Sequence, residues 1–211
     1  MKLSFVIPAY NEEDLIGKCL DSILKQAAGR PDDIEIIVVN NASTDKTREI
    51  ASSFPEVIII DEPEKGLVSA RRAGFLASSG DLIANVDADT VLTPGWIDKV
   101  LKAFSDNQNL IALSGPHIFY DLSRTFNFWV RLFYGIAFAS YLLNRFVFRV
   151  GSLLQGGNFI VKRSALKKIG GYNPEFDFWG EDSDLARRLH PIGDVKFTFN
   201  LPIYASGRRI V

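Results

Sequence analysis

Two aspartates that follow a short apolar run are the first candidates for chemistry. Asp87 and Asp89 come directly after Leu82–Val86. In an extended chain a spacing of two residues sends both side chains to the same face. Mg²⁺ takes one or two protein carboxylates and leaves its other positions to water and substrate phosphates. An Asp-x-Asp pair arises easily by chance, so its position after a predicted buried strand is what favours a site for Mg²⁺ or Mn²⁺ beside a departing diphosphate.

A second acidic group stands at the start of a predicted helix and contains Glu181, Asp182 and Asp184. Acids favour helix N-termini through capping and the macrodipole, which alone could explain two of the three. A carboxylate beside other carboxylates can also have a raised pKa, which suits a general base that takes a proton from a hydroxyl. Both interpretations stay open at this point.

Two arginine pairs, Arg71-Arg72 and Arg208-Arg209, are candidate phosphate binders. The guanidinium fork matches phosphate oxygens in paired hydrogen bonds, although paired basic residues are more often simply solvated. With 24 basic and 25 acidic residues the chain has no global field that would attract nucleic acid. We therefore expect any anion site to be local and expect no nucleic-acid partner.

Several common catalytic motifs are missing from the sequence. It has no Gly-x-x-x-x-Gly-Lys loop and no Gly-x-Ser-x-Gly turn, and His117 and His190 have no partner at metal-ligand spacing. These features disfavour phosphate-loop hydrolysis, esterase chemistry and zinc catalysis. The single cysteine, Cys19, fits a reducing compartment, so we expect a cytoplasmic location without a secretory signal. The longest uncharged apolar run, Leu132–Asn144, is shorter than the ~20 residues that cross a bilayer, so we expect no membrane span.

Apolar runs and helical periodicity alternate through the first half of the chain. Glu12–Gln26 carries apolar residues at helical spacing. Ser43 or Thr44 is the predicted cap of the next helix, and Thr93-Pro94 the predicted start of the one through Trp96, Val100 and Phe104. This alternation predicts an open, mostly parallel α/β sheet with right-handed crossovers. Four short runs suit parallel strands covered on both faces: Leu3–Ile7, Ile34–Val39, Val57–Ile60 and Leu82–Val86.

The second half has a different character, beginning with the aromatic-rich segment Phe126–Val150, which predicts one or two helices. Within 211 residues we find no repeat or linker, so we expect one domain spanning 1–211. The remaining predicted elements are a strand from Asn158 to Val161, a short helix capped by Ser164 and ended by Gly170-Gly171, a helix over Leu185–Leu189, and a half-buried strand in which Val195, Phe197 and Phe199 alternate.

Polar residues follow three of the predicted strands, at Pro8–Glu12, Asn40–Ser43 and Asp87–Asp89. In an open α/β sheet the ligand crevice lies beyond the carboxyl ends of the strands. All three segments should therefore face one crevice, although Asn, Asp and Ser also make ordinary turns and caps.

At this point the chain resembles a known family, the inverting glycosyltransferases of family 2 with the GT-A fold. The resemblance implies a single GT-A-type α/β domain with a Rossmann-like nucleotide-sugar-binding half over 1–115 and an acceptor-binding, catalytic-base half over 116–211. Five blocks carry it in this order: Ser4–Glu12; Glu35–Asp45; Lys65-Gly66 with Ala70-Arg71; Asp87-Ala88-Asp89; and Gly156-Gly157-Asn158 with Gly180–Leu185.

The resemblance also implies roles for individual residues. Asp182 is expected to be the general base, and Asp87 and Asp89 to hold Mg²⁺ or Mn²⁺ with the diphosphate. The acceptor side is expected at Gly157, Asn158, Trp179, Gly180 and Glu181. Donor-binding residues are expected at Pro8, Ala9, Tyr10, Glu12, Asn40, Lys65, Gly66, Arg71, Asp87, Ala88 and Asp89, to which we add Arg208 and Arg209.

The sequence departs from the family pattern at two places. Asn40-Asn41-Ala42-Ser43 stands where the family commonly has Asp-Asp-Gly-Ser, and Arg72 stands where it commonly has Asn. An Asn side chain both donates and accepts hydrogen bonds, so Asn40 leaves the nucleoside open. A UDP-sugar remains the favoured donor.

The expected function is metal-dependent transfer of a sugar from a nucleotide diphosphate to an acceptor hydroxyl or a lipid phosphate. A nucleotidyltransferase is one alternative, but it would want a Gly-rich basic loop where Pro8–Asp14 is acidic. A non-catalytic sugar-nucleotide-binding or membrane-interaction module is the other, and the presence of Asp89 and Asp182 disfavours it.

Phe126–Val150 has two competing interpretations. Its aromatic side chains could pack on the sheet or on a second subunit, which leaves a homo-oligomer open. Arg131, Arg145 and Arg149 interleave with the aromatics, a mixture that suits a helix lying beside anionic headgroups. The second interpretation predicts peripheral contact with the cytosolic face of a membrane, where a lipid-linked acceptor would be presented.

Overall fold

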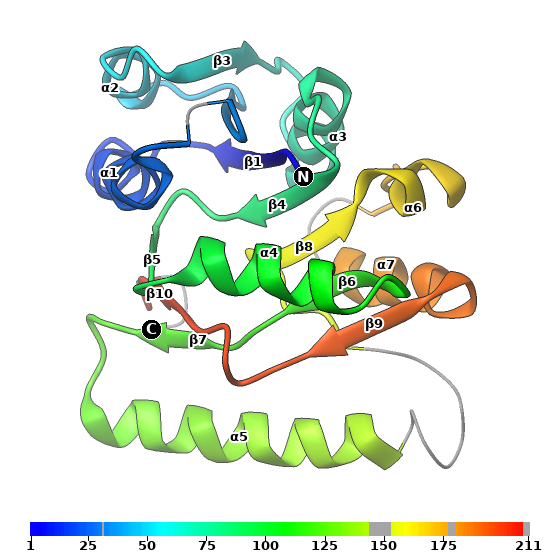
Figure 1. The fold of residues 1–211 in the computed structure, drawn as a ribbon. Helices are drawn as coiled ribbons and strands as arrows, with labels where there is room; N and C mark the ends of the chain where they lie inside the picture. The colour runs from blue at the N-terminus through cyan, green and yellow to red at the C-terminus, as the bar shows by residue number, and fades with distance from the viewer. Residues whose placement is uncertain (31, 144–152, 177–179, 209–211) are drawn as a thin grey trace.

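The computed structural model describes residues 1–211 except 31, 144–152, 177–179 and 209–211 (Figure 1). A seven-stranded sheet runs through the molecule in the order β3-β2-β1-β4-β8-β6-β9, and β8 is antiparallel to both of its neighbours. The mixed, mainly parallel α/β architecture confirms the predicted fold class. Its strands are β1 (Leu3–Ala9), β2 (Ile34–Asn40), β3 (Val57–Asp61), β4 (Leu82–Val86), β6 (Leu110–Ser114), β8 (Asn158–Lys162) and β9 (Asp194–Phe197).

Helices cover both faces of this sheet, and side chains that alternate along each strand separate the two cores. In β1, Phe5 belongs to one core and Val6 to the other. Helices α1 (Ile16–Ala27) and α4 (Trp96–Asp106) pack into the first core. Helices α3 (Leu67–Ala77), α6 (Arg163–Lys168) and α7 (Glu181–Leu189) pack into the second, and the short α2 (Thr47–Ser52) contacts α1.

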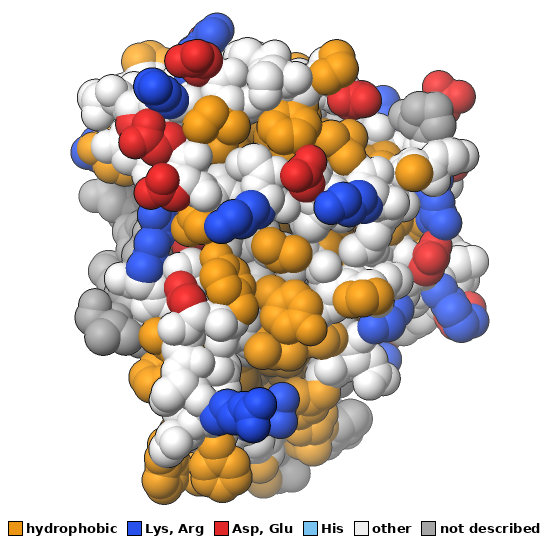
Figure 2. Space-filling model, turned by 90° about the vertical axis from the view of Figure 1, so that its left-hand side faces the viewer, with side chains coloured by type: hydrophobic (Ala, Val, Ile, Leu, Met, Phe, Trp, Pro, Cys, Tyr) orange, Lys and Arg blue, Asp and Glu red, His pale blue; other side chains and the backbone are white. Residues whose placement is uncertain are grey.

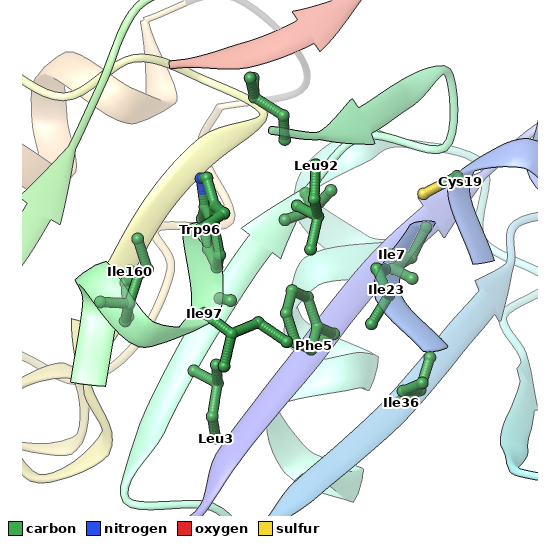
Figure 3. Close-up of a cluster of buried hydrophobic side chains, with 14 of the residues drawn as sticks. Leu3, Phe5, Ile7, Cys19, Ile23, Ile36, Leu92, Trp96, Ile97 and Ile160 are labelled. Carbon is green, nitrogen blue, oxygen red and sulfur yellow. The ribbon is translucent and has the colours of Figure 1, made fainter. Parts of the chain in front are cut away.

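The first core is built around Phe5 and Trp96, whose ring centroids lie 5.8 Å apart (Figure 3). Ile23 of α1 and Ile36 of β2 lie in the same cluster. Because large apolar side chains from α1, α4 and the central strands interlock here, the loops that leave the carboxyl ends of β1 and β4 start from a rigid base.

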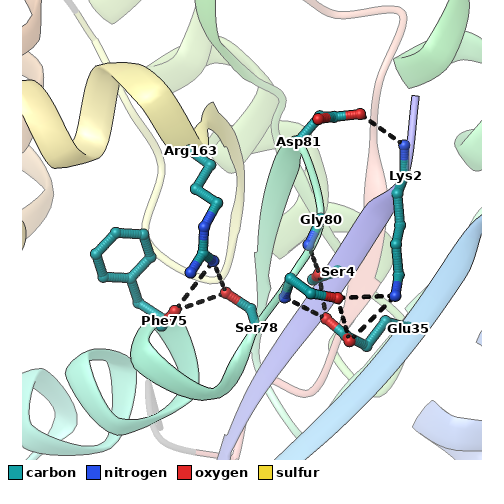
Figure 4. Close-up of polar contacts among 9 residues, drawn as sticks. Lys2, Ser4, Glu35, Phe75, Ser78, Gly80, Asp81 and Arg163 are labelled. Atoms are coloured by element: carbon teal, nitrogen blue, oxygen red, sulfur yellow. Dashed lines mark hydrogen bonds and ion pairs between the residues drawn. The ribbon is translucent and has the colours of Figure 1, made fainter.

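Polar contacts fix the amino ends of the strands, which lie at the side of the sheet opposite the carboxyl ends (Figure 4). The Glu35 carboxylate accepts hydrogen bonds from the hydroxyls of Ser4 and Ser79 and pairs with Lys2. Burial works against ionisation, but these hydrogen bonds hold the pKa of Glu35 down to about 2. On the neighbouring element, the Arg163 guanidinium donates to the Ser78 hydroxyl. These contacts join the strands to one another at the end that lies far from the crevice.

A second, three-stranded sheet was not predicted. It contains β5 (Thr90–Leu92), β10 (Ile203–Ala205) and β7 (His117–Phe119), with β10 in the middle. Each strand has three residues, too few for a clear alternation pattern in the sequence. The sheet brings the segment after β10 beside the loop after β4.

Two predicted helix caps and one predicted strand residue are wrong. The Asp45 carboxylate, rather than Ser43 or Thr44, accepts the first free amide of α2, that of Thr47. Ser164 lies inside α6, which begins at Arg163 without a side-chain cap. Phe199 lies beyond the end of β9, and its side chain is exposed.

Helix α5 (Arg124–Leu143) lies outside both helical layers, along the bottom of Figure 1. Its inner face is anchored by Tyr134, whose hydroxyl accepts the His117 amide, and by Tyr141, whose hydroxyl donates to the Val195 carbonyl at 3.2 Å. By length and composition its 20 residues could cross a membrane. We expected no membrane span from the sequence because only the uncharged run Leu132–Asn144 was counted, whereas the helix extends further toward its amino end.

Candidate functional site

A cavity of about 510 Å³ opens beyond the carboxyl ends of β1 and β4. Figure 2 looks onto this side of the molecule, where apolar side chains are bordered by both acidic and basic ones. Ten of the thirteen predicted donor-binding residues line the cavity; Asn40 and Arg71 do not, and Arg209 lies outside the described residues. The lining is Pro8, Ala9, Tyr10, Asn11, Glu12, Asn41, Lys65, Gly66, Leu67, Asp87, Ala88, Asp89 and Arg208.

The loops after β1 and β2 interlock to form one wall. Asn11 and Ala42 both have left-handed backbones, with φ of 53° and 58°. The Asn11 side chain accepts the Thr44 amide at 2.8 Å, and the Ser43 hydroxyl accepts the Asn11 amide at 3.2 Å. Asn11 belongs to the segment Pro8–Glu12 that was expected to face the crevice, but it was not named among the donor-binding residues. Asn tolerates a left-handed turn better than most residues do.

The start of α3 forms the facing wall. Lys65 donates to the Tyr10 hydroxyl at 2.6 Å, which links this wall to the loop after β1. Asn41 accepts the Gly66 amide at 2.8 Å, so the neighbouring loop is fixed to the same point. Asn41 lies in the segment Asn40–Ser43 that was expected to face the crevice, but it was not named among the donor-binding residues. Lys65 is exposed and lines the cavity, where it can meet an anionic ligand.

Asp87 and Asp89 both line the cavity, as predicted, but they lie in a turn after β4 rather than in an extended strand. Thr90 closes that turn by donating its amide and its hydroxyl to the Asp87 carbonyl. The Asp87 carboxylate is further fixed on one side by Arg71, at 3.5 Å.

These two carboxylates fit a hard divalent cation. They are oxygen donors that face a cavity large enough for further oxygen ligands from a phosphate group. Over the residues that the structure describes, no group of three or more His, Cys, Asp and Glu side chains is arranged to hold a metal. Two carboxylates alone would leave most positions of such an ion to water or to the oxygens of a ligand.

Arg208 reaches the cavity from the segment after β10 and forms an ion pair with the Glu12 carboxylate. Asp121 holds this segment in place, because its carboxylate accepts the Gly207 amide at 2.7 Å and the Ser206 hydroxyl at 2.6 Å. Nothing in the sequence singled out Asp121. Arg208 thus lines the same cavity as Lys65.

Asn40 lies at the end of β2 with 9% of its surface exposed. Its amide donates to Asp61 at 2.8 Å, while its Oδ1 is buried and has no hydrogen-bond partner among the described residues. Asp61 also binds Arg48, and that guanidinium lowers the pKa of the Asp61 carboxyl. This buried Oδ1 thus lies behind the cavity lining rather than facing the cavity.

The three acids of α7 have different environments. Asp182 is half-buried, and its carboxylate accepts the Gly156 amide at 3.2 Å and the Ser183 amide at 2.8 Å. Asp184 is buried and paired with Arg187 and Arg188. These contacts tie up the Asp184 carboxylate, whereas Asp182 is only half-buried, although it does not line the cavity.

Glu181 is buried and forms an ion pair with Arg71. Burial raises its pKa, while the positive charge of Arg71 works against that rise. Both side chains lie behind Asp87 and do not line the cavity.

The predicted acceptor residues lie in different surroundings. The Asn158 side chain is fully buried, where it accepts the Trp96 indole N–H at 3.3 Å and donates to the Leu201 carbonyl at 3.0 Å. Gly157 packs its backbone against the Asp87 carboxylate, and Gly180 precedes α7 with a φ of 83°. Trp179 lies outside the described residues.

Comparison with known families and proteins gives a consistent picture. The model of Glycosyl transferase family 2 matches residues 4–170, which is well over half of the chain, and the model described as the N-terminal domain of galactosyltransferase matches residues 148–198. The probable glycosyltransferase YdaM of Bacillus subtilis is 29% identical over 218 residues, covering 91% of this chain. The chain spans 47% of that relative, about half its length.

Two solved structures share the fold. A mannosyltransferase from Pyrobaculum calidifontis, PcManGT, solved with GDP-Man and Mn²⁺, has a TM-score of 0.74 at 21% identity and covers 97% of this chain and 56% of its own. TarS 1–349 of S. aureus, solved with UDP-GlcNAc, has a TM-score of 0.71 at 16% identity and covers 98% of this chain and 58% of its own.

Proposed function

Because the chain belongs to glycosyltransferase family 2, we propose that it transfers a sugar with inversion from a nucleotide diphosphate donor to an acceptor hydroxyl or phosphate. The observation that carries this proposal is the pair Asp87 and Asp89 in a cavity of about 510 Å³ beyond the strands. The cations Lys65 and Arg208 lie at the same cavity and would meet a diphosphate. Residues 1–115 would hold the donor, and residues 116–211 would supply the acceptor side and the base.

The donor would bind with its nucleoside along the loops after β1 and β2 and its diphosphate beside Asp87 and Asp89. A bound Mg²⁺ or Mn²⁺ would neutralise charge on the leaving diphosphate. The GDP-Man and Mn²⁺ of PcManGT and the UDP-GlcNAc of TarS support this class of ligand. We favour a UDP-sugar, and because Asn40 does not line the cavity we assign it no contact with the base.

Asp182 would act as the general base. The acceptor oxygen attacks the anomeric carbon from the face opposite the diphosphate, its proton passes to the Asp182 carboxylate, and the bond from the anomeric carbon to the diphosphate oxygen breaks. Two backbone amides orient that carboxylate and leave it lone pairs for the proton.

A panel of UDP- and GDP-sugars, screened by thermal shift with and without Mn²⁺, tests donor binding. A ligand at ~100 times its Kd stabilises by about 2.7 kcal/mol, which is readily measured. We expect at least one sugar nucleotide to raise Tm only when the cation is present. A panel without any shift would contradict the proposal, and transfer of the nucleotide group itself would favour a nucleotidyltransferase.

The acceptor side would lie near a membrane, because the outer face of α5 is apolar. Phe128, Trp129, Phe133 and Ile136 each expose more than 60% of their surface, and α5 contains no Asp or Glu. Arg131 can extend to anionic headgroups; Arg145 and Arg149 lie outside the described residues. Apolar side chains also gather at the bottom of Figure 2. We favour peripheral contact with a cytosolic leaflet, where a lipid-linked acceptor would be within reach.

Co-sedimentation with anionic vesicles measures this contact. A Phe128→Ser, Phe133→Ser, Ile136→Ser variant should lose most vesicle binding, while Leu76→Ser, which changes a 75%-exposed leucine on α3, should bind like the wild type. Arg131→Ala should weaken binding at low salt only. A wild type that stays in solution at both low and physiological salt would contradict membrane contact, and self-association through α5 would then be measured by ultracentrifugation.

A further inference from the structure

Arg71 is a buried cation between two carboxylates. Its side chain is 1% exposed, forms an ion pair with Glu181 of α7, and lies 3.5 Å from Asp87 at the end of β4. Glu181 is itself only 4% exposed. The guanidinium therefore joins the acid that faces the cavity to the first residue of the helix that carries Asp182.

A second connection joins the same two regions through the turn before β8. The Gly156 amide donates to the Asp182 carboxylate, and the Gly157 carbonyl accepts the Asp87 amide at 3.4 Å. A Cβ at Gly157 would lie 2.1 Å from Asp87 Oδ2, so backbone and carboxylate are in tight contact. Asp87 and Asp182 are thus linked on both sides, once through Arg71 and Glu181 and once through the two glycines.

Stability alone is a weak explanation for this ion pair. A buried pair loses the hydration of two charges, and apolar residues of similar volume often stabilise a fold equally well. Arg71 Nε and Glu181 Oε1 are also buried without hydrogen-bond partners in the described part of the chain. What the pair supplies, and an apolar pair would not, is a directional link between Asp87 and the start of α7.

We propose that Arg71 and Glu181 are positioning residues that set the place of Asp182 relative to Asp87. The base would then lie within reach of the acceptor that attacks the sugar whose diphosphate is bound at Asp87. The inference rests on the proposed function, because it gives Asp182 and Asp87 their roles. Misplacing a reacting group by about 1 Å can lower a rate by ~10²-fold, so a small shift of α7 would be measurable.

The test is a double-mutant cycle of kcat between Glu181→Gln and Asp182→Asn. Glu181→Gln keeps the side-chain volume and removes the charge that Arg71 binds. We expect it to lower kcat by about 10-fold or more with donor KM within about 3-fold, and to change kcat by less than about 2-fold in the Asp182→Asn background. Equal losses in both backgrounds, or a wild-type kcat for Glu181→Gln, would overturn the inference. Failure of the proposed function would instead appear in Asp182→Asn alone, as wild-type turnover.

Two further variants separate positioning from folding. Asp184→Asn breaks another buried acid–arginine pair of α7, with Arg188, and should lower Tm without lowering kcat. The double variant Arg71→Met, Glu181→Leu replaces the ion pair by apolar packing and should stay folded, yet lose kcat as Glu181→Gln does. A folded double variant with wild-type kcat would show that the pair only stabilises the fold.

Discussion

Gly157→Ala tests how closely the backbone before β8 holds the proposed metal ligand. Gly157 has a φ of 74°, and an added Cβ would lie 2.1 Å from Asp87 Oδ2. Contacts of a Cβ under 3.0 Å are essentially never seen, so the two atoms must separate by at least 3.0 − 2.1 = 0.9 Å. The left-handed backbone adds about 1–2 kcal/mol of strain for alanine, or roughly 2–8 °C in Tm for a chain of this size.

Gly170→Ala is the matched control for that strain. Gly170 has a φ of 81°, but its added Cβ would meet nothing within 4 Å. Both variants should lose Tm, whereas only Gly157→Ala should weaken Mn²⁺-dependent binding of a nucleoside diphosphate, by about 10- to 100-fold in titration calorimetry. Wild-type affinity in Gly157→Ala, or the same loss in both variants, would refute the role given to this contact.

Two further predictions concern Glu35 at the amino ends of the strands and Arg208 at the cavity beyond their carboxyl ends. Glu35 has its pKa lowered from 4.5 to about 2, so its ionisation stabilises the fold above pH ~4.5 and that contribution disappears as the pH falls toward 2. The unfolding free energy of Glu35→Gln should therefore lie about 2 kcal/mol below that of the wild type at pH 6, with a gap that narrows between pH 4.5 and 2 in urea titrations; a constant gap would contradict this. Arg208→Ala should raise donor KM and weaken nucleoside diphosphate inhibition together, by about 5- to 10-fold, while Arg48→Ala, which removes an exposed pair with Asp61, should change neither. If the Arg208 variant keeps both constants, Arg208 only neutralises Glu12.

The sequence was sufficient to predict the central strands but not the small sheet. β1, β2 and β4 are apolar runs buried on both faces, and such a continuous apolar run is itself the sequence signal of a buried parallel strand. β5 and β10 have three residues each and exist because Thr90–Leu92 and Ile203–Ala205 pair across a long stretch of chain. Pairing between such distant short segments leaves no local pattern to detect.

The candidate site was likewise predictable from the sequence in one part and not in another. The cavity around Asp87 and Asp89 was predictable because polar residues follow buried strands, and strand ends converge in this fold. The location of Arg71 was not, because paired basic residues usually lie in solvent. Only the fold reveals that Glu181, 110 residues away, forms an ion pair with it beneath the cavity.

The most direct test of the account is release of nucleoside diphosphate from a sugar nucleotide, measured for the wild type and for Asp89→Ala with Mn²⁺ and a membrane extract as the source of acceptor. Release by the wild type should depend on both the cation and the extract. Asp89→Ala should lose at least about 10²-fold of that rate, because one carboxylate cannot hold both cation and diphosphate. A wild type that releases no nucleoside diphosphate from any sugar nucleotide, or an Asp89→Ala variant that releases it at the wild-type rate, would contradict the central claim.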